Sequence, residues 1–160
     1  MFRVVGAIIG GGLTAGLCDF VFASIFYPLR AHIPVERIWQ SVASGVLGKA
    51  AFDGGYAAAA LGVSLHFFIA TVMAAAFVMV TLKLKFLSRY WLIFGPLYGI
   101  FLFYAMQGVV LQLSNVPTKP DLSHLPIIGK NMINFYSALG IHAVVGTVIA
   151  LFSRRAQPRE

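Results

Sequence analysis

Long apolar runs, interrupted by few charges, dominate this chain. Four stretches contain no Lys, Arg or Glu over a length that can cross a bilayer as a helix, which takes about 20 residues: Val4–Leu29, Tyr56–Leu82, Tyr90–Thr118 and Asn131–Ser153. A lone segment in lipid must pair its own backbone groups, so each stretch is predicted to be helical. The pattern predicts an all-α, polytopic bundle of four transmembrane spans that forms one membrane domain over residues 1–160.

A shorter apolar segment, Val35–Phe52, lies between the first two stretches. Only 11 uncharged residues separate Arg37 from Lys49, which is too few for a span. We interpret this segment as an interfacial or re-entrant helix in the first outer loop. Gly54 and Gly55 follow it and are expected to break the helix before the second span begins.

Composition restricts the class of protein further. Hydrophobic residues make up 59% of the chain and charged residues 11%, whereas soluble domains carry roughly 45–50% and about 25%. This balance excludes a soluble globule, a disordered chain and a nucleic-acid-binding module, in spite of the net charge of +7. The expected partner is the lipid bilayer.

The basic residues lie at the ends of the apolar runs and predict the orientation. Short segments that flank the spans on the side of the termini carry seven of them: Arg3, Lys83, Lys85, Arg89, Arg154, Arg155 and Arg159. Three of these belong to a short basic tail, residues 154–160. Because cytoplasmic loops are enriched in Lys and Arg, both termini are predicted to be cytoplasmic.

The two halves of the chain repeat one another. Residues 66–74 and 142–150 share the pattern H-x-x-[IV]-[AG]-T-V-[MI]-A, and G-x-x-x-G occurs earlier in each half, at Gly12–Gly16 and Gly95–Gly99. This order favours a tandem duplication of a two-helix hairpin, with repeat 1 at about 4–82 and repeat 2 at about 90–153. Such repeats are parallel, and their pseudo-two-fold axis runs along the membrane normal.

The repeat places two histidines at the same predicted depth. His66 lies about ten residues into its span and His142 about eleven, which at 1.5 Å per residue is roughly 15 Å into the membrane for both. Asp19 and Gln107 are further polar residues within spans. Because ionisable groups are expensive in lipid, we treat Asp19, His66, Gln107 and His142 as a candidate intramembrane polar site.

Several interpretations of these polar residues remain open. Each imidazole can simply hydrogen-bond a neighbouring helix. Together with Asp19 and Gln107, the two imidazoles can line a path for protons or a solute. His66 and His142 can alternatively hold a metal or a haem b between them, because equal depth on two helices suits bis-histidine ligation. Asp19 can also lie near the outer headgroups, paired with Arg30 or Lys49.

Small and aromatic residues are assigned to packing and anchoring. Glycines spaced four apart let helices approach closely, and the candidate packing positions are Gly6, Gly10, Gly12, Gly16, Gly95 and Gly99. Aromatic residues near the predicted span ends are expected to form interfacial belts: Tyr27, Trp39, Tyr56, Tyr90, Trp91 and Tyr136.

The motifs of soluble enzymes are missing from the sequence, which has no G-x-S-x-G, H-E-x-x-H, C-x-x-C or phosphate-binding loop. We therefore expect a non-enzymatic protein without a cofactor. The first hypothesis is a structural or accessory membrane subunit that forms a homo-oligomer or joins a larger membrane complex. The alternatives are a small proton, ion or solute transporter or channel that uses Asp19, His66 and His142, and a bis-histidine haem b electron carrier.

Several segments resemble a known group of proteins. They are Ile33–Gly55, the motif A-L-G-x-x-x-H-F at residues 60–67, G-x-x-Y-G at residues 95–99, and Leu113-Ser114. Together they resemble small bacterial inner-membrane proteins with four helices. The resemblance implies a location in the bacterial inner membrane and a four-helix bundle, and it carries no assigned activity and no catalytic residues.

Overall fold

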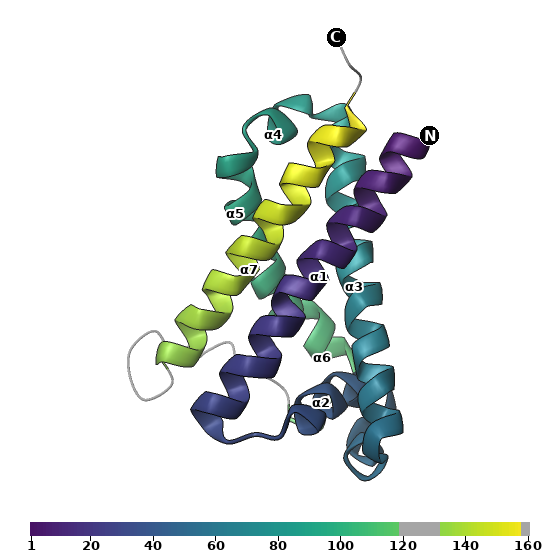
Figure 1. The fold of residues 1–160 in the computed structure, drawn as a ribbon, viewed down its shortest axis with the longest axis vertical. Helices are drawn as coiled ribbons and strands as arrows, with labels where there is room; N and C mark the ends of the chain where they lie inside the picture. Colours follow the sequence, from purple (N-terminus) through teal and green to yellow (C-terminus); the bar gives the residue numbers. More distant parts are fainter. Residues whose placement is uncertain (119–131, 158–160) are drawn as a thin grey trace.

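The computed structural model describes residues 1–118 and 132–157, and nearly all of these residues are helical (Figure 1). Within them, four helices are long and apolar enough to cross a membrane: Phe2–Ala31, Gly55–Lys83, Trp91–Leu113 and Met132–Ala156. The prediction of an all-helical, multi-pass membrane bundle is therefore confirmed. The start of the first of these helices and the end of the last lie at the same end of the bundle, as an even number of membrane crossings requires.

Helix α1 (Phe2–Ala31) is separated from α2 (Val35–Leu47) by a sharp turn. His32 ends α1 in the left-handed conformation (φ 54°), and its backbone N–H donates to the carbonyl of Pro28. Pro34 then precedes α2, where a fixed φ and a missing N–H suit a helix start. A short helix thus lies within the segment that the sequence predicted to be helical between the first two spans.

Helix α2 and the 3₁₀-helix η1 (Gly48–Asp53) pack beside α3 (Gly55–Lys83). At Gly62 the backbones of α2 and α3 meet directly, because a Cβ added to Gly62 of α3 would overlap the carbonyl of Trp39. Near the start of α2, the Arg37 guanidinium donates to the carbonyl of Phe52 in η1 at 2.9 Å. Helix α2 is therefore fixed against the start of the second span.

The third span is not a regular α-helix. After α4 (Lys85–Arg89), it runs through α5 (Trp91–Ala105), the π-helix η2 (Met106–Val110) and α6 (Leu111–Leu113). It ends at Leu113, before the predicted limit at Thr118, and Ser114 is already extended. Pro117 follows closely, and proline disfavours helical backbone just before it.

The last span, α7 (Met132–Ser153), continues into the 3₁₀-helix η3 (Arg154–Ala156). Helix α7 packs along α5 and also along α1, which in turn packs on α3. Figure 1 shows α1 and α7 side by side in the middle of the bundle. Helices α3 and α5 approach one another far less closely, and between them the ring of Tyr98 lies against Phe77 with centroids 4.6 Å apart.

Glycines form the closest helix contacts. An added Cβ on Gly12 would lie 2.5 Å from the Cα of Thr71 on α3, and one on Gly95 would lie 2.7 Å from the Cα of Thr147 on α7. Gly10, Gly16 and Gly99 also face neighbouring helices or side chains. Gly6 has no atom within 4 Å of the added Cβ, so it faces open space. Gly146, which the G-x-x-x-G pattern does not mark, packs against Gly95 and Gly99.

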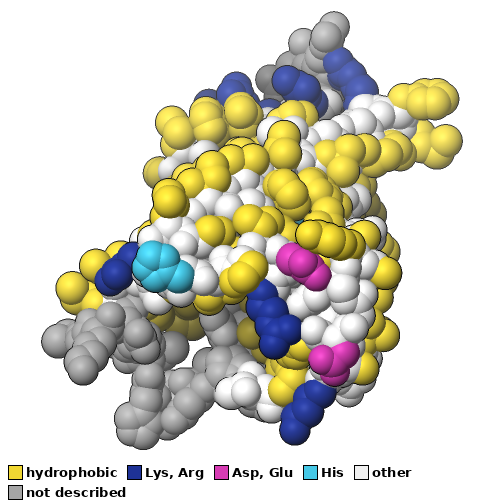
Figure 2. All heavy atoms as spheres, turned by 60° about the horizontal axis from the view of Figure 1, so that its bottom comes forward, with side chains coloured by type: hydrophobic (Ala, Val, Ile, Leu, Met, Phe, Trp, Pro, Cys, Tyr) yellow, Lys and Arg dark blue, Asp and Glu magenta, His cyan; other side chains and the backbone are white. Residues whose placement is uncertain are grey.

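The flanks of the bundle are apolar. On α1, large side chains recur every four residues along the outward face, and each is between 45% and 55% exposed: Val5, Ile9, Leu13, Leu17, Val21 and Ile25. Figure 2 shows hydrophobic side chains over most of the flank, with charged side chains gathered towards the two ends. This is the distribution that a lipid environment selects.

Candidate functional site

Three of the four candidate polar residues line one cavity inside the bundle. Asp19 comes from α1, His66 from α3 and His142 from α7. The cavity has a volume of about 70 Å³. The rest of its wall is backbone or apolar side chain: Ala15, Gly16, Ile69, Ala70, Met73, Leu102, Met106 and Val145.

Asp19 is paired with a histidine of the neighbouring helix. Its carboxylate Oδ2 lies 3.8 Å from Nδ1 of His66, and the two side chains keep 24% and 15% of their surface exposed. The sequence suggested Arg30 or Lys49 as partners, but neither forms a described ion pair with Asp19. Gly16 explains why His66 is the neighbour of Asp19. Because Gly16 has no side chain, α3 can approach α1 there, and Phe67 and Ala70 of α3 pack against Gly16.

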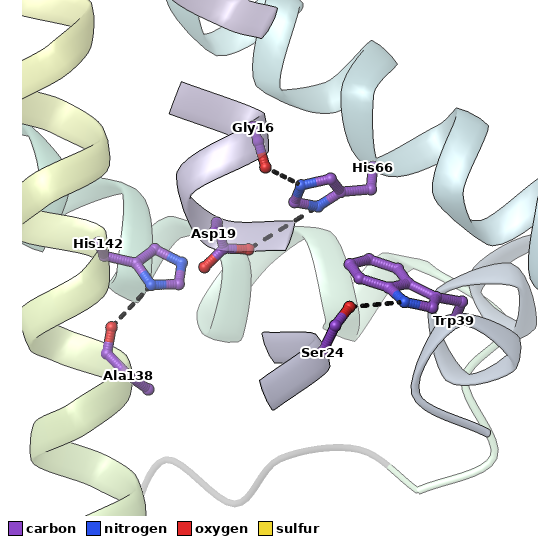
Figure 3. A network of polar contacts seen from close by, with 7 residues as sticks. All are labelled: Gly16, Asp19, Ser24, Trp39, His66, Ala138 and His142. Atoms are coloured by element: carbon purple, nitrogen blue, oxygen red, sulfur yellow. Dashed lines mark hydrogen bonds and ion pairs between the residues drawn. The ribbon is translucent and has the colours of Figure 1, made fainter. Parts of the chain in front are cut away.

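Each imidazole has one nitrogen occupied by a backbone carbonyl. Nε2 of His66 lies 2.9 Å from the carbonyl oxygen of Gly16, across the α1–α3 contact. Nδ1 of His142 lies 2.8 Å from the carbonyl oxygen of Ala138, one turn back on its own helix. In Figure 3 the Asp19 carboxylate stands between the two rings, and the second nitrogen of each ring is on the side that faces Asp19. The carboxylate therefore has an imidazole on either side.

An aromatic cluster supports His66 on the side of α2. The Trp39 ring lies edge-on to the His66 ring, with centroids 5.2 Å apart, and Phe20 stacks on Trp39 at 4.6 Å. Trp39 Nε1 donates to Ser24 Oγ at 3.2 Å. Its place near the end of an apolar run predicted that Trp39 belongs to an interfacial belt, whereas Trp39 is only 4% exposed. Trp39 thus links α2 to the polar site through its ring and to α1 through its N–H.

The cavity is closed on the side of the chain termini. Beyond it, Ala74, Phe77, Ile149 and Ala150 continue the buried apolar cluster to which the cavity residues Ala15, Leu102 and Val145 also belong. The hydroxyl of Tyr98 crosses from α5 to donate to the carbonyl of Met73 at 2.8 Å. The ionisable side chains of the cavity thus lie next to an apolar layer on this side.

Gln107 is not part of this site. It lies in the π-helix one residue beyond Met106, which lines the cavity, but Gln107 itself does not. Its backbone carbonyl accepts a hydrogen bond from Gln112 at 3.4 Å. A π-turn adds a residue to one helical turn and shifts the direction of the side chains that follow, so sequence position alone did not predict which face Gln107 would take.

Metal and haem binding were open possibilities for His66 and His142. Among residues 1–118 and 132–157, no group of three or more His, Cys, Asp and Glu side chains is arranged to hold a metal ion. A cavity of about 70 Å³ is also far smaller than a porphyrin. Haem would have to separate the helices that carry the two rings, and haem ligation by His66 and His142 stays a prediction.

The chain was compared with protein families, curated proteins and solved structures. It matches no family model, and neither curated proteins nor solved structures give a significant match. The function must therefore be inferred from the chemistry of the cavity.

Proposed function

We propose that this protein is a small membrane transporter or channel for protons, other ions or a small solute, and that it works through Asp19, His66 and His142. One observation carries this proposal: three ionisable groups on three separate spans line one cavity. A carboxylate at a helix centre in lipid costs about 2.5–3.5 kcal/mol. Groups of this kind, gathered inside a bundle, characteristically mark a substrate or ion pathway.

An apolar layer between the cavity and the terminal side of the bundle favours a transporter over an open channel. The apolar core beyond the cavity closes the side towards the termini, and Tyr98 bridges α5 and α3 there. Alternating access requires a site that is closed on one side at a time. Helices α3 and α5 pack against each other little apart from Tyr98, and we propose that the bundle rearranges between them.

We also propose that the bundle arose by tandem duplication of a hairpin. Gly12 meets Thr71 in the first half as Gly95 meets Thr147 in the second. The same alignment pairs residues on opposite walls of the cavity: His66 with His142, Ile69 with Val145, and Asp19 with Leu102. The cavity would then lie on the pseudo-two-fold axis, where parallel repeats typically form their binding sites.

The proposed setting is the bacterial inner membrane, with both termini in the cytoplasm. Support comes from the basic residues at the end of the bundle where the chain starts and finishes. Single cysteines introduced at Arg3 and Arg155, in a Cys18→Ser background, should resist a membrane-impermeant maleimide in whole cells and react after lysis. Labelling of either position in intact cells would reverse the orientation.

Transport is tested in proteoliposomes that contain the full chain. We expect the unmodified protein to move protons or at least one member of a panel of small cations, anions and neutral solutes. Asp19→Asn and His66→Gln should abolish most of that flux, since each removes one half of the pair at the cavity. Matched controls are Asp53→Asn and His32→Asn, which change exposed residues outside the cavity. Equal flux in protein-free vesicles would remove the transport proposal.

A structural or accessory role is the second candidate. Gly6 and Gly140 have no atom within 4 Å of an added Cβ, so small residues face outwards where another helix can approach. Under this proposal the protein is non-enzymatic and forms a homo-oligomer or part of a larger complex. Native mass spectrometry of membranes solubilised without detergent exchange should then find the protein in an assembly of defined mass. The variants Gly6→Leu and Gly140→Leu should dissociate this assembly.

A further inference from the structure

We propose that the cavity is a proton-sharing site, in which Asp19 exchanges one proton with Nδ1 of His66 and with Nε2 of His142. This inference rests on the proposed function and narrows it: the species that the site takes up is the proton. It follows from the tautomers that the surrounding carbonyls impose, from the size of the cavity and from the donors that line it.

The carbonyl contacts determine which nitrogen of each ring can accept a proton. A backbone carbonyl only accepts hydrogen bonds, so the nitrogen that faces it must carry hydrogen. For His66 that nitrogen is Nε2, and for His142 it is Nδ1. The neutral rings therefore keep their lone pairs on His66 Nδ1 and His142 Nε2. Both of these nitrogens are on the side of the ring that faces Asp19 (Figure 3).

Although the two rings are held in opposite tautomers, each presents one nitrogen that can accept a proton to the cavity. His66 is locked through a contact with α1, and His142 through a contact within α7. Each ring thus offers the cavity one site that binds or releases a proton and one nitrogen that does not exchange. Histidine is the side chain whose charge ordinarily changes between pH 5 and 8. Within residues 1–118 and 132–157, the carboxylate between the rings is the only acidic group that lines the cavity.

The size and lining of the cavity disfavour larger cargo. A volume of about 70 Å³ admits a few water molecules, since each needs roughly 10–15 Å³ by this kind of measure. A cation such as Ca²⁺ requires about six to eight oxygen ligands, and among the residues that the structure describes Asp19 supplies the one carboxylate of the cavity wall. The thioethers of Met73 and Met106 and the aliphatic walls offer no substitute for those oxygens. A proton needs only the three groups already present.

The transfer is balanced as two successive steps. In the first, protonated His66 releases the proton on Nδ1 to the Asp19 carboxylate, which leaves a neutral imidazole and a carboxylic acid. In the second, that acid gives the proton to His142 Nε2, which becomes an imidazolium while the carboxylate is restored. The 3.8 Å separation of His66 Nδ1 and Asp19 Oδ2 exceeds a direct hydrogen bond, so a water or a small side-chain rotation completes the first step.

The other polar and titratable groups around the cavity do not take over the role of Asp19, His66 and His142. On α1 the phenol of Tyr27 also interacts electrostatically with Asp19. From α3 the titratable group is His66, and from α7 it is His142, while the α5 and η2 segment contributes Leu102 and Met106 to the wall. Helix α2 contributes the neutral indole of Trp39 beside His66. Removal of Asp19 should therefore change both histidines at once.

Solid-state nitrogen-15 NMR of the full chain in lipid bilayers tests proton sharing directly. The sequence has four histidines, and His66→Gln and His142→Gln variants assign the two of interest. At high pH we expect the Nε2–H tautomer for His66 and the Nδ1–H tautomer for His142. As the pH falls, both rings should gain a second proton, and Asp19→Asn should shift both titrations while Asp53→Asn shifts neither. Identical tautomers, or titrations that ignore Asp19→Asn, would overturn the proposal.

Flux measurements separate this inference from the proposed function. With a pH-sensitive dye inside proteoliposomes and a potassium diffusion potential, proton flux should fall at least about a hundredfold in Asp19→Asn, because a positioned proton acceptor contributes about 10²–10⁴-fold. Flux of sodium, chloride or a neutral solute without protons would overturn proton sharing and leave transport standing. Shared titration in the NMR spectra without any flux would keep the proton site and remove the transport function.

Discussion

Replacing Gly99 with alanine should weaken the bundle more than any other single-methyl change we consider. Gly99 of α5 faces the backbone of α7, and an added Cβ would overlap the carbonyl of His142 and crowd the Cα of Ala143. Backbone atoms cannot rotate away as a side chain can, so α5 and α7 must separate. Overpacking of this kind typically costs about 1–3 kcal/mol, and the far side of the contact, Gly146, is equally tight.

The matched control for this variant is Gly140→Ala. Gly140 lies on α7, and nothing stands within 4 Å of the Cβ that alanine adds. Alanine is also a better helix former than glycine, so Gly140→Ala should leave stability unchanged or raise it slightly. Steric trapping in bicelles gives the free energy of unfolding for both. Equal values for Gly99→Ala and Gly140→Ala would show that α5 and α7 do not meet as described.

The spans were predictable from the sequence because the bilayer sets their length and excludes charge. That Gly12 and Gly16 pack against another helix was predictable for a related reason, since only small residues let two backbones meet, but the sequence did not show that the partner is α3. Gly62 and Gly146 were not predicted, because each stands alone in the pattern and faces a partner that the sequence does not reveal. In a helix that is apolar on all sides, periodicity no longer shows which face packs inwards.

Trp39 and Asp19 show how far the candidate site could be predicted. A tryptophan near the end of an apolar run has the same signature whether it anchors at the interface or packs inside, and Trp39 packs inside. The sequence identified Asp19 as a candidate but suggested cationic partners, Arg30 and Lys49. The real neighbour, His66, depends on how α3 docks on Gly16, which is a property of the assembled bundle.

Moving the carboxylate to the other side of the proposed pseudo-two-fold axis should change its histidine partner from His66 to His142. In the double variant Asp19→Leu/Leu102→Asp, the acid would stand at the position that the repeat pairs with Asp19. Leu102 lines the same cavity from α5, and its neighbour Phe103 lies edge-on to His142 with centroids 5.4 Å apart. We expect Asp19→Leu alone to lose proton flux by about a hundredfold or more, and the double variant to recover part of it.

The recovered activity should depend on charge and on the opposite half of the bundle. Asp19→Leu/Leu102→Asn has the same size and burial but cannot ionise, so it should stay as inactive as Asp19→Leu. In the NMR titration, the double variant should couple its carboxylate to His142 more strongly than to His66, the reverse of the unmodified protein. All variants must first elute as the same species and keep the same helical circular dichroism. If Asp19→Leu/Leu102→Asp and Asp19→Leu/Leu102→Asn then show the same proton flux, a carboxylate at position 102 cannot replace one at position 19. In that case the two walls of the cavity are not equivalent, and the proposed duplication does not explain the site.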